Sequence, residues 1–191
     1  MGSGPVRMHS GRGRSLFKRR YLGGLSEVTE QLRTECLRRL AEGEERIVKC
    51  VGLLSDDQIW HRANSHVASV GNLVLHLCGN VGQWINATLG ELPDIRIRDA
   101  EFEERGPVPR TELLDRLAKV MKLARQTIAE LPSGGVTRIW NVQGFEETGT
   151  AILLHVVEHF SYHTGQITLH TKLLLDIDTG YYAHQDLNAK G

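Results

Sequence analysis

The sequence predicts an all-α fold organised as a four-helix bundle. Four segments carry apolar residues at helical spacing: 27–54, 69–90, 110–131 and 150–175. The sequence shows neither a βαβ pattern nor an internal repeat. The connections differ in length, so simple alternation of helix direction is not assumed. The 191 residues are enough for one domain with an apolar core.

The overall charge gives no indication of a nucleic-acid or membrane partner, and we expect neither. Lys and Arg number 23, as do Asp and Glu, so the formal net charge is zero. Residues 1–20 are basic, with six cations and no acid: Arg7, Arg12, Arg14, Lys18, Arg19 and Arg20. Because this region lacks apolar periodicity, we expect residues 1–24 to form a basic, flexible tail and residues 25–191 to form the helical domain. A phosphate-binding arm is the alternative interpretation of the tail.

The cysteines and the N-terminus favour a cytoplasmic protein. Cys36, Cys50 and Cys78 are odd in number and form no C-x-x-C pair, which is typical of a reducing compartment. No apolar stretch follows the basic N-terminal residues, so no secretory signal is indicated.

The first helix is expected to begin after Ser26 and to end near Leu54. Its apolar positions recur at helical spacing: Leu32, Leu40, Ile47, Val51 and Leu54. Gly43 is expected to weaken its middle. The motif "SDDQ" at 55–58 predicts a capping box, followed by a short helical turn that carries Trp60.

The second helix lies in a stretch with no charged residue, from Ala63 to Gly90. One face is apolar: Val70, Val74, Leu77, Cys78, Val81 and Ile85. The opposite face carries Asn72, His76, Asn80 and Gln83, which argue against a membrane span. A solvated face would normally carry Lys and Glu. We therefore interpret this polar stripe as the wall of a sheltered, partly wet cleft.

The second half of the chain holds two more helices. Three prolines, Pro93, Pro107 and Pro109, mark a long connection over residues 91–109. An amphipathic helix over residues 110–131 follows, with Thr111 as the expected cap and an apolar stripe of Leu113, Leu117, Val120, Met121, Ala124 and Ile128. Residues 136–149 are expected to form an extended strap, and the last helix to run from Thr150 to Leu175.

The last helix carries four of the nine histidines, in "HVVEHFSYHTGQITLH" at 155–170. These histidines share one half of the helix with Ile152, Val156, Ile167, Leu173 and Leu174. A buried imidazole must be hydrogen-bonded, bind metal or face a wet cavity. Residues four apart can share one ion, whereas eight residues span roughly 12 Å. The candidate pairs are therefore His155/His159 and His159/His163, with His76 as the best donor from a facing helix.

A purely structural role is the alternative for these residues, since a single H-x-x-x-H pattern is often a false positive. His9, His61 and His66 are expected to lie at the surface or in the tail, and His184, in the C-terminal stretch, to be structural or exposed.

Two motifs, "SVGNLVLHLCGNVGQW" and "HVVEHFSYHTGQI", resemble the signature helices of the DinB-like family, also called YfiT-like metalloenzymes, in a branch of unknown function. The resemblance covers most of residues 26–175 and includes "SDDQIW", "RIRDAEFEERG" and "HTGQITLHTK". It implies a four-helix bundle wired up-down-down-up, often dimeric. It also implies a divalent metal held by His76, His159 and His163, and so selects His159/His163 over His155/His159. Thr164 departs from the family, in which many members have a basic residue before "GQ".

The expected function is that of a divalent-metal-dependent enzyme. Three neutral imidazoles leave coordination positions open, as in catalytic sites. Zinc or nickel fits best, with iron, manganese or copper as alternatives. The resemblance implies a small-molecule substrate, such as a low-molecular-weight thiol, and a thiol-dependent S-transferase or hydrolase reaction. The alternative is a non-catalytic metal-binding or stress-response module.

No catalytic residue is assigned from the sequence. Four amide side chains are placed to orient the ligands: Asn72, Asn80, Gln83 and Gln166. Glu146 and Glu147 precede the last helix and are candidate general bases.

Overall fold

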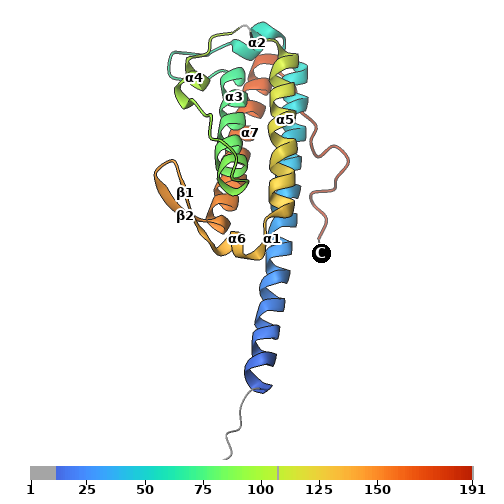
Figure 1. The fold of residues 1–191 in the computed structure, drawn as a ribbon. Coiled ribbons are helices and arrows are strands. Elements are labelled where there is room, and N and C mark those ends of the chain that lie inside the picture. The colour runs from blue at the N-terminus through green and yellow to red at the C-terminus, as the bar shows by residue number, and fades with distance from the viewer. Residues whose placement is uncertain (1–11, 107, 191) are drawn as a thin grey trace, which may run out of the picture.

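The computed structural model describes residues 12–106 and 108–190, and it is mostly helical (Figure 1). This confirms the predicted helical class. The helices are α1 (Arg12–Leu53), α2 (Asp56–Trp60), α3 (Val70–Val81), the π-helix η1 (Gly82–Leu89), α4 (Arg98–Glu103), α5 (Arg110–Glu130), α6 (Ser133–Thr137) and α7 (Gly149–Leu175). Two short strands, β1 (Ile139–Val142) and β2 (Phe145–Thr148), precede α7.

The first helix begins at Arg12, earlier than the predicted start after Ser26. Residues 12–24, assigned to the tail from the sequence, thus continue α1, while residues 1–11 lie outside the described residues. Leu, Lys and Arg favour helix, and extending an existing helix is much easier than starting one. The first turns of α1 project beyond the other helices (Figure 1).

Hydrogen bonds at both ends fix the direction of α5 against α1. At one end, Arg110 donates to the carbonyl oxygens of Gly52 and Leu54, each at 3.1 Å. At the other end, Arg33 donates to the carbonyl oxygens of Ala129 (3.1 Å) and Leu131 (2.7 Å). The start of α5 therefore lies at the end of α1, and the two helices are antiparallel.

Gly43 lets α7 pack closely against α1. A Cβ atom at this position would lie 2.8 Å from Cδ1 of Phe160 and 3.3 Å from Oγ1 of Thr164. Gly43, expected only to weaken α1, is therefore also a point of close helix contact.

The predicted apolar stripes of α1 and α5 supply much of the core. The buried members are Leu40, Ile47, Val51, Leu54, Leu113, Leu117, Met121, Ala124 and Ile128. Leu32 and Val120 of these stripes are only partly buried. On α7, Leu173 is expected to face the core but is 75% exposed. The most buried positions of α7 include Leu153, Val156, Phe160, Ile167 and Thr171. At 100° per residue, these positions centre roughly 90° from His159, so the histidines lie at the edge of the buried face and Leu173 lies outside it.

The short elements follow their local signals, with one correction. The predicted capping box at Ser55 is present, and Ser69 forms a second one with Asn72 at the start of α3. The N-cap of α5 is Pro109 and not Thr111, and it provides no side-chain hydrogen bond. The fixed φ of Pro109 ends the connection in an extended conformation and lets the helix begin at Arg110.

The predicted extended strap is an antiparallel hairpin. Ile139 pairs with Thr148 and Val142 with Phe145. Gln143 and Gly144 form the turn with φ values of 51° and 82°, the left-handed conformation that a two-residue hairpin turn requires. Within the described residues, none of the helices is both long enough and apolar enough to cross a membrane.

Candidate metal centre

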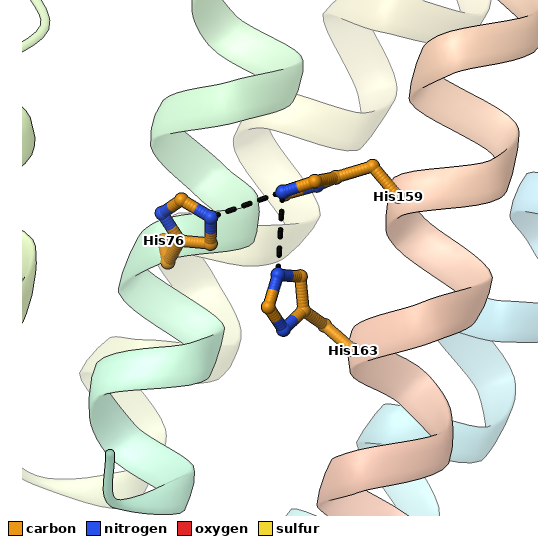
Figure 2. Close-up of side chains that lie close together, drawn as sticks. All are labelled: His76, His159 and His163. Atoms are coloured by element: carbon orange, nitrogen blue, oxygen red, sulfur yellow. Dashed lines mark hydrogen bonds between the residues drawn. The ribbon is translucent and has the colours of Figure 1, made fainter. Parts of the chain in front are cut away.

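Three histidine side chains from two helices point toward one another, as Figure 2 shows. The Nε2 atom of His159 lies 3.1 Å from Nε2 of His76 and 3.2 Å from Nε2 of His163. One ring nitrogen from each residue lies within 4.8 Å of the others, a spacing that could hold a metal ion. The structure thus brings together His76 on α3 with His159 and His163 on α7.

His155 does not join this cluster. Its ring stacks on Trp84 of η1, with centroids 3.9 Å apart and an interplanar angle of 26°. Of the two pairs that spacing leaves open, the structure therefore places His159/His163 beside His76.

For two of the histidines, the hydrogen-bond partner of Nδ1 shows which ring nitrogen carries the hydrogen. Nδ1 of His76 lies 2.8 Å from Oε2 of Glu101, and Nδ1 of His163 lies 2.6 Å from Oε1 of Gln166. An ionised carboxylate and an amide oxygen only accept hydrogen bonds, so each Nδ1 carries the hydrogen. In the neutral rings, the Nε2 atoms of His76 and His163 consequently present lone pairs to His159.

The third histidine cannot satisfy both lone pairs. A neutral His159 has one proton, and its Nε2 faces both neighbouring Nε2 atoms. If that proton is on Nε2, it can make a well-aligned hydrogen bond with only one of the two neighbouring Nε2 atoms. If it is on Nδ1, three lone pairs converge, and His159 Nδ1 is buried with no hydrogen-bond partner among the described residues. A cation bound by the lone pairs of all three Nε2 atoms would resolve this conflict, so the three nitrogens fit a metal ion.

The local environment keeps His159 and His163 neutral. Burial, followed by the charges of His163, His76, His155 and Arg96, lowers the pKa of His159 to about 3. Burial also lowers the pKa of His163, although its hydrogen bond with Gln166 acts in the opposite direction. Neutral imidazole is the form that binds metals, so both residues are ready for ligation near neutral pH.

Glu101 and Arg96 are part of the site although neither has a role predicted from the sequence. Arg96 donates to both carboxylate oxygens of Glu101, from Nε at 2.7 Å and from Nη2 at 3.0 Å. Burial would raise the pKa of Glu101, but the hydrogen bonds from His76 and Arg96 outweigh burial and lower it. Both residues come from the connection between α3 and α5, where no periodic pattern marks a buried charge.

The amides predicted to orient the ligands have different roles. Gln166 contacts His163 as expected, whereas Gln83 bonds to Arg96 (3.0 Å) and Asp94 (2.7 Å). Asn72 bonds to the backbone of the α4 region and not to a ligand histidine. The Oδ1 atom of Asn80 is buried and has no hydrogen-bond partner among the described residues.

The candidate general bases lie on β2, where Glu146 is exposed and Glu147 is half-buried. The charge of Glu147 acts on His155, outside the cluster of three histidines. His61, His66 and His184 are exposed as expected, and His9 lies outside the described residues.

Comparison with solved structures identifies relatives in fold. A conserved protein from Enterococcus faecalis has a TM-score of 0.65 at 15% identity, covering 75% of this chain and 97% of its own. A DinB-like protein from Bacillus cereus has a TM-score of 0.57 at 16% identity, covering 73% and 90%. A DinB-like protein from Bacillus subtilis has a TM-score of 0.58 at 15% identity, covering 73% and 91%. These similarities show the fold alone.

Sequence comparison identifies the family. None of the curated proteins matches the chain significantly. A family model described as a protein of unknown function, DUF1572, matches residues 27–180. The chain has a DinB-like fold. It belongs to the DUF1572 family of proteins of unknown function.

Proposed function

We propose that this protein is a divalent-metal-dependent enzyme whose metal is bound by the Nε2 atoms of His76, His159 and His163. The observation that carries the proposal is the convergence of these atoms, with two lone pairs directed at His159 by the hydrogen bonds of Glu101 and Gln166. A hydrogen-bonded core would instead pair each acceptor with a donor.

The donor set supports a catalytic site over a closed structural one. Within the described part of the chain, the cluster contains three donors and no fourth His, Cys, Asp or Glu. Structural zinc sites usually have four protein ligands, whereas three leave a position for water or substrate. Imidazole ligands suit zinc, copper, iron and nickel; we propose zinc or nickel, with iron, manganese or copper as alternatives. When bound, such an ion supplies a Lewis acid that lowers the pKa of a water or thiol.

The substrate proposed for this site is a small molecule such as a low-molecular-weight thiol, used in an S-transferase or hydrolase reaction. Three neutral ligands leave the positive charge of the ion uncompensated, which favours an anionic group such as a thiolate. We also propose an up-down-down-up four-helix bundle that forms a homodimer in the cytoplasm. The antiparallel packing of α5 on α1 supports the wiring, and the free thiols of Cys36, Cys50 and Cys78 support the compartment.

Metal analysis of the purified protein tests the proposal. After incubation with zinc or nickel and gel filtration, the wild-type protein should retain about one ion per chain. His76→Ala, His159→Ala and His163→Ala should retain much less. His170→Ala is the matched control, because it removes a half-buried histidine from the same helix, away from the cluster, and should keep the ion. Unchanged metal content in all three ligand variants would contradict the proposal.

A cobalt-substituted protein tests whether the metal has an open position. Addition of a small thiol should change the visible spectrum of the bound cobalt as the sulfur coordinates. A spectrum that is unchanged at saturating thiol would indicate a closed, non-catalytic metal site.

A further inference from the structure

The connection between α3 and α5 places a buried ion pair against the outer edge of His76. Glu101 is 8% exposed, and its Oε2 atom accepts the hydrogen bond from Nδ1 of His76. Nη2 of Arg96 lies 3.2 Å from the same Nδ1 and 3.0 Å from Oε2. Since Nδ1 and Nη2 are both donors, both direct their hydrogens at the carboxylate, which is the common acceptor.

Gly79 of α3 provides the space that this ion pair occupies. A Cβ atom at Gly79 would overlap with Oε1 of Glu101, and it would lie 2.7 Å from Cδ of Glu101 and 2.9 Å from Nε of Arg96. Glycine within a helix is less favourable than alanine. Gly79 is absent from the positive-φ positions among the described residues, so the reason for glycine is space and not backbone conformation.

The backbone around Glu101 is fixed independently of its carboxylate. Nδ2 of Asn72 donates to the carbonyl oxygens of Glu101 and Glu104, each at 2.9 Å. Nη2 of Arg62 donates to the carbonyl oxygen of Phe102 at 2.9 Å and to Oδ1 of Asn72 at 2.7 Å. The start of α3 thus holds α4, and α4 presents Glu101 to His76 one helical turn further along α3.

We infer that Glu101 is a positioning residue for His76 and that it depends on the space left by the missing side chain of Gly79. Glu101 holds the imidazole in the tautomer whose Nε2 lone pair points at His159. The metal-binding part of this inference rests on the proposed function, whereas the tautomer does not.

The positive charge of Arg96 balances the negative charge of Glu101 beside His76. The carboxylate of Glu101 contributes −1 and the guanidinium of Arg96 contributes +1, so the pair orients His76 without adding net charge. With neutral histidines, a bound divalent cation keeps its full charge for an incoming ligand. The preferred substrate class is therefore a small molecule that coordinates through an anionic atom, such as a thiolate or carboxylate.

The test measures the His76 tautomer and metal affinity in Glu101→Ala and Gly79→Ala. Nitrogen-15 NMR of the metal-free imidazoles should show hydrogen on Nδ1 of His76 in the wild-type protein and a shift toward hydrogen on Nε2 in both variants. Zinc affinity, measured by competition with a chelator, should fall about 10- to 100-fold in both. Glu101→Gln keeps an acceptor oxygen and should restore part of the affinity.

Two matched controls separate positioning from general damage. Glu103→Ala removes an exposed acid from the same short helix, and Gly82→Ala adds a methyl group in open space beyond α3. Both should keep the wild-type tautomer and zinc affinity. Gly79→Ala changes no ligand, so a loss of affinity in this variant would act through the Glu101–Arg96 ion pair, and Glu101→Ala separates the part of Glu101.

The outcomes distinguish this inference from the proposed function. An unchanged His76 tautomer in folded Glu101→Ala and Gly79→Ala overturns the positioning role, whatever the metal content. A wild-type protein that binds none of zinc, nickel, iron, manganese and copper overturns the proposed function, while a tautomer that depends on Glu101 still supports the positioning role.

Discussion

Acid should destabilise the metal-free protein through His159. Burial and the neighbouring charges lower the pKa of this residue to about 3 in the folded state, against about 6.5 in the unfolded chain. The unfolded chain therefore takes up a proton near pH 6.5, while the folded protein does not until the pH approaches 3. Stability that is present above pH 6.5 is lost progressively as the pH falls.

The size of the effect follows from proton linkage. For a histidine that remains neutral in the folded protein, lowering the pH from 7 to 5 costs about 2 kcal/mol of the free energy of unfolding. The ring of His159 is only partly buried, so solvent screening reduces this contribution to roughly 1–2 kcal/mol.

Urea denaturation of the chelator-treated wild-type protein and of His159→Gln, each at pH 7 and pH 5, measures this contribution. Both proteins should lose stability at pH 5, because burial also lowers the pKa of His155 and His163. The wild-type loss should exceed that of the variant by about 1–2 kcal/mol. Equal losses would refute the reasoning, because they would mean that His159 takes up its proton equally in both states.

Three further predictions concern packing, the α4 region and metal binding. Gly43→Ala should lower the free energy of unfolding by about 1–2 kcal/mol, because its Cβ would lie 2.8 Å from the Phe160 ring. The control Gly52→Ala, in open space on the same helix, should raise it by about 0.5–1 kcal/mol. Equal urea midpoints for the two variants would contradict this prediction. Asn72→Ala should cost about 1–3 kcal/mol and speed hydrogen exchange at residues 100–104, and unchanged exchange would argue against its bracing role. Zinc at 100 times its Kd should stabilise the wild-type protein by about 2.7 kcal/mol but not His76→Ala, and the same thermal shift in both would exclude this site.

The sequence predicts what repeats along a helix. The stripes of α1 and α5 recur at helical spacing, and the structure buries most of them. Spacing also limits ion sharing on α7 to two histidine pairs, and the family resemblance points to the one that the structure places beside His76. Periodicity alone could not choose, because the stacking of His155 on Trp84 is a contact between distant segments.

Glu101 and Arg96 could not be predicted in the same way. They lie in a proline-bounded connection whose course depends on contacts with α3, including the hydrogen bonds from Asn72 and the space above Gly79. A short helix such as α4 contains too few turns to show a buried face. The polar stripe of α3 was nevertheless informative, since Asn72, His76 and Asn80 are all buried.

The position of the three histidines fits the proposed metal site, which needs fixed ligands and an exposed side. His76 is 5% exposed, and the hydrogen bond from its Nδ1 to Glu101 fixes the orientation of the ring and of its Nε2 atom. His159 and His163 are only partly buried, because they lie at the edge of the packed face of α7. A site at the centre of that face would exclude substrate, and one on the solvent side would let the imidazoles take up protons near their ordinary pKa. The edge of the packed face therefore suits the proposed metal site, because burial lowers the pKa of His159 and His163 while both side chains keep part of their surface exposed.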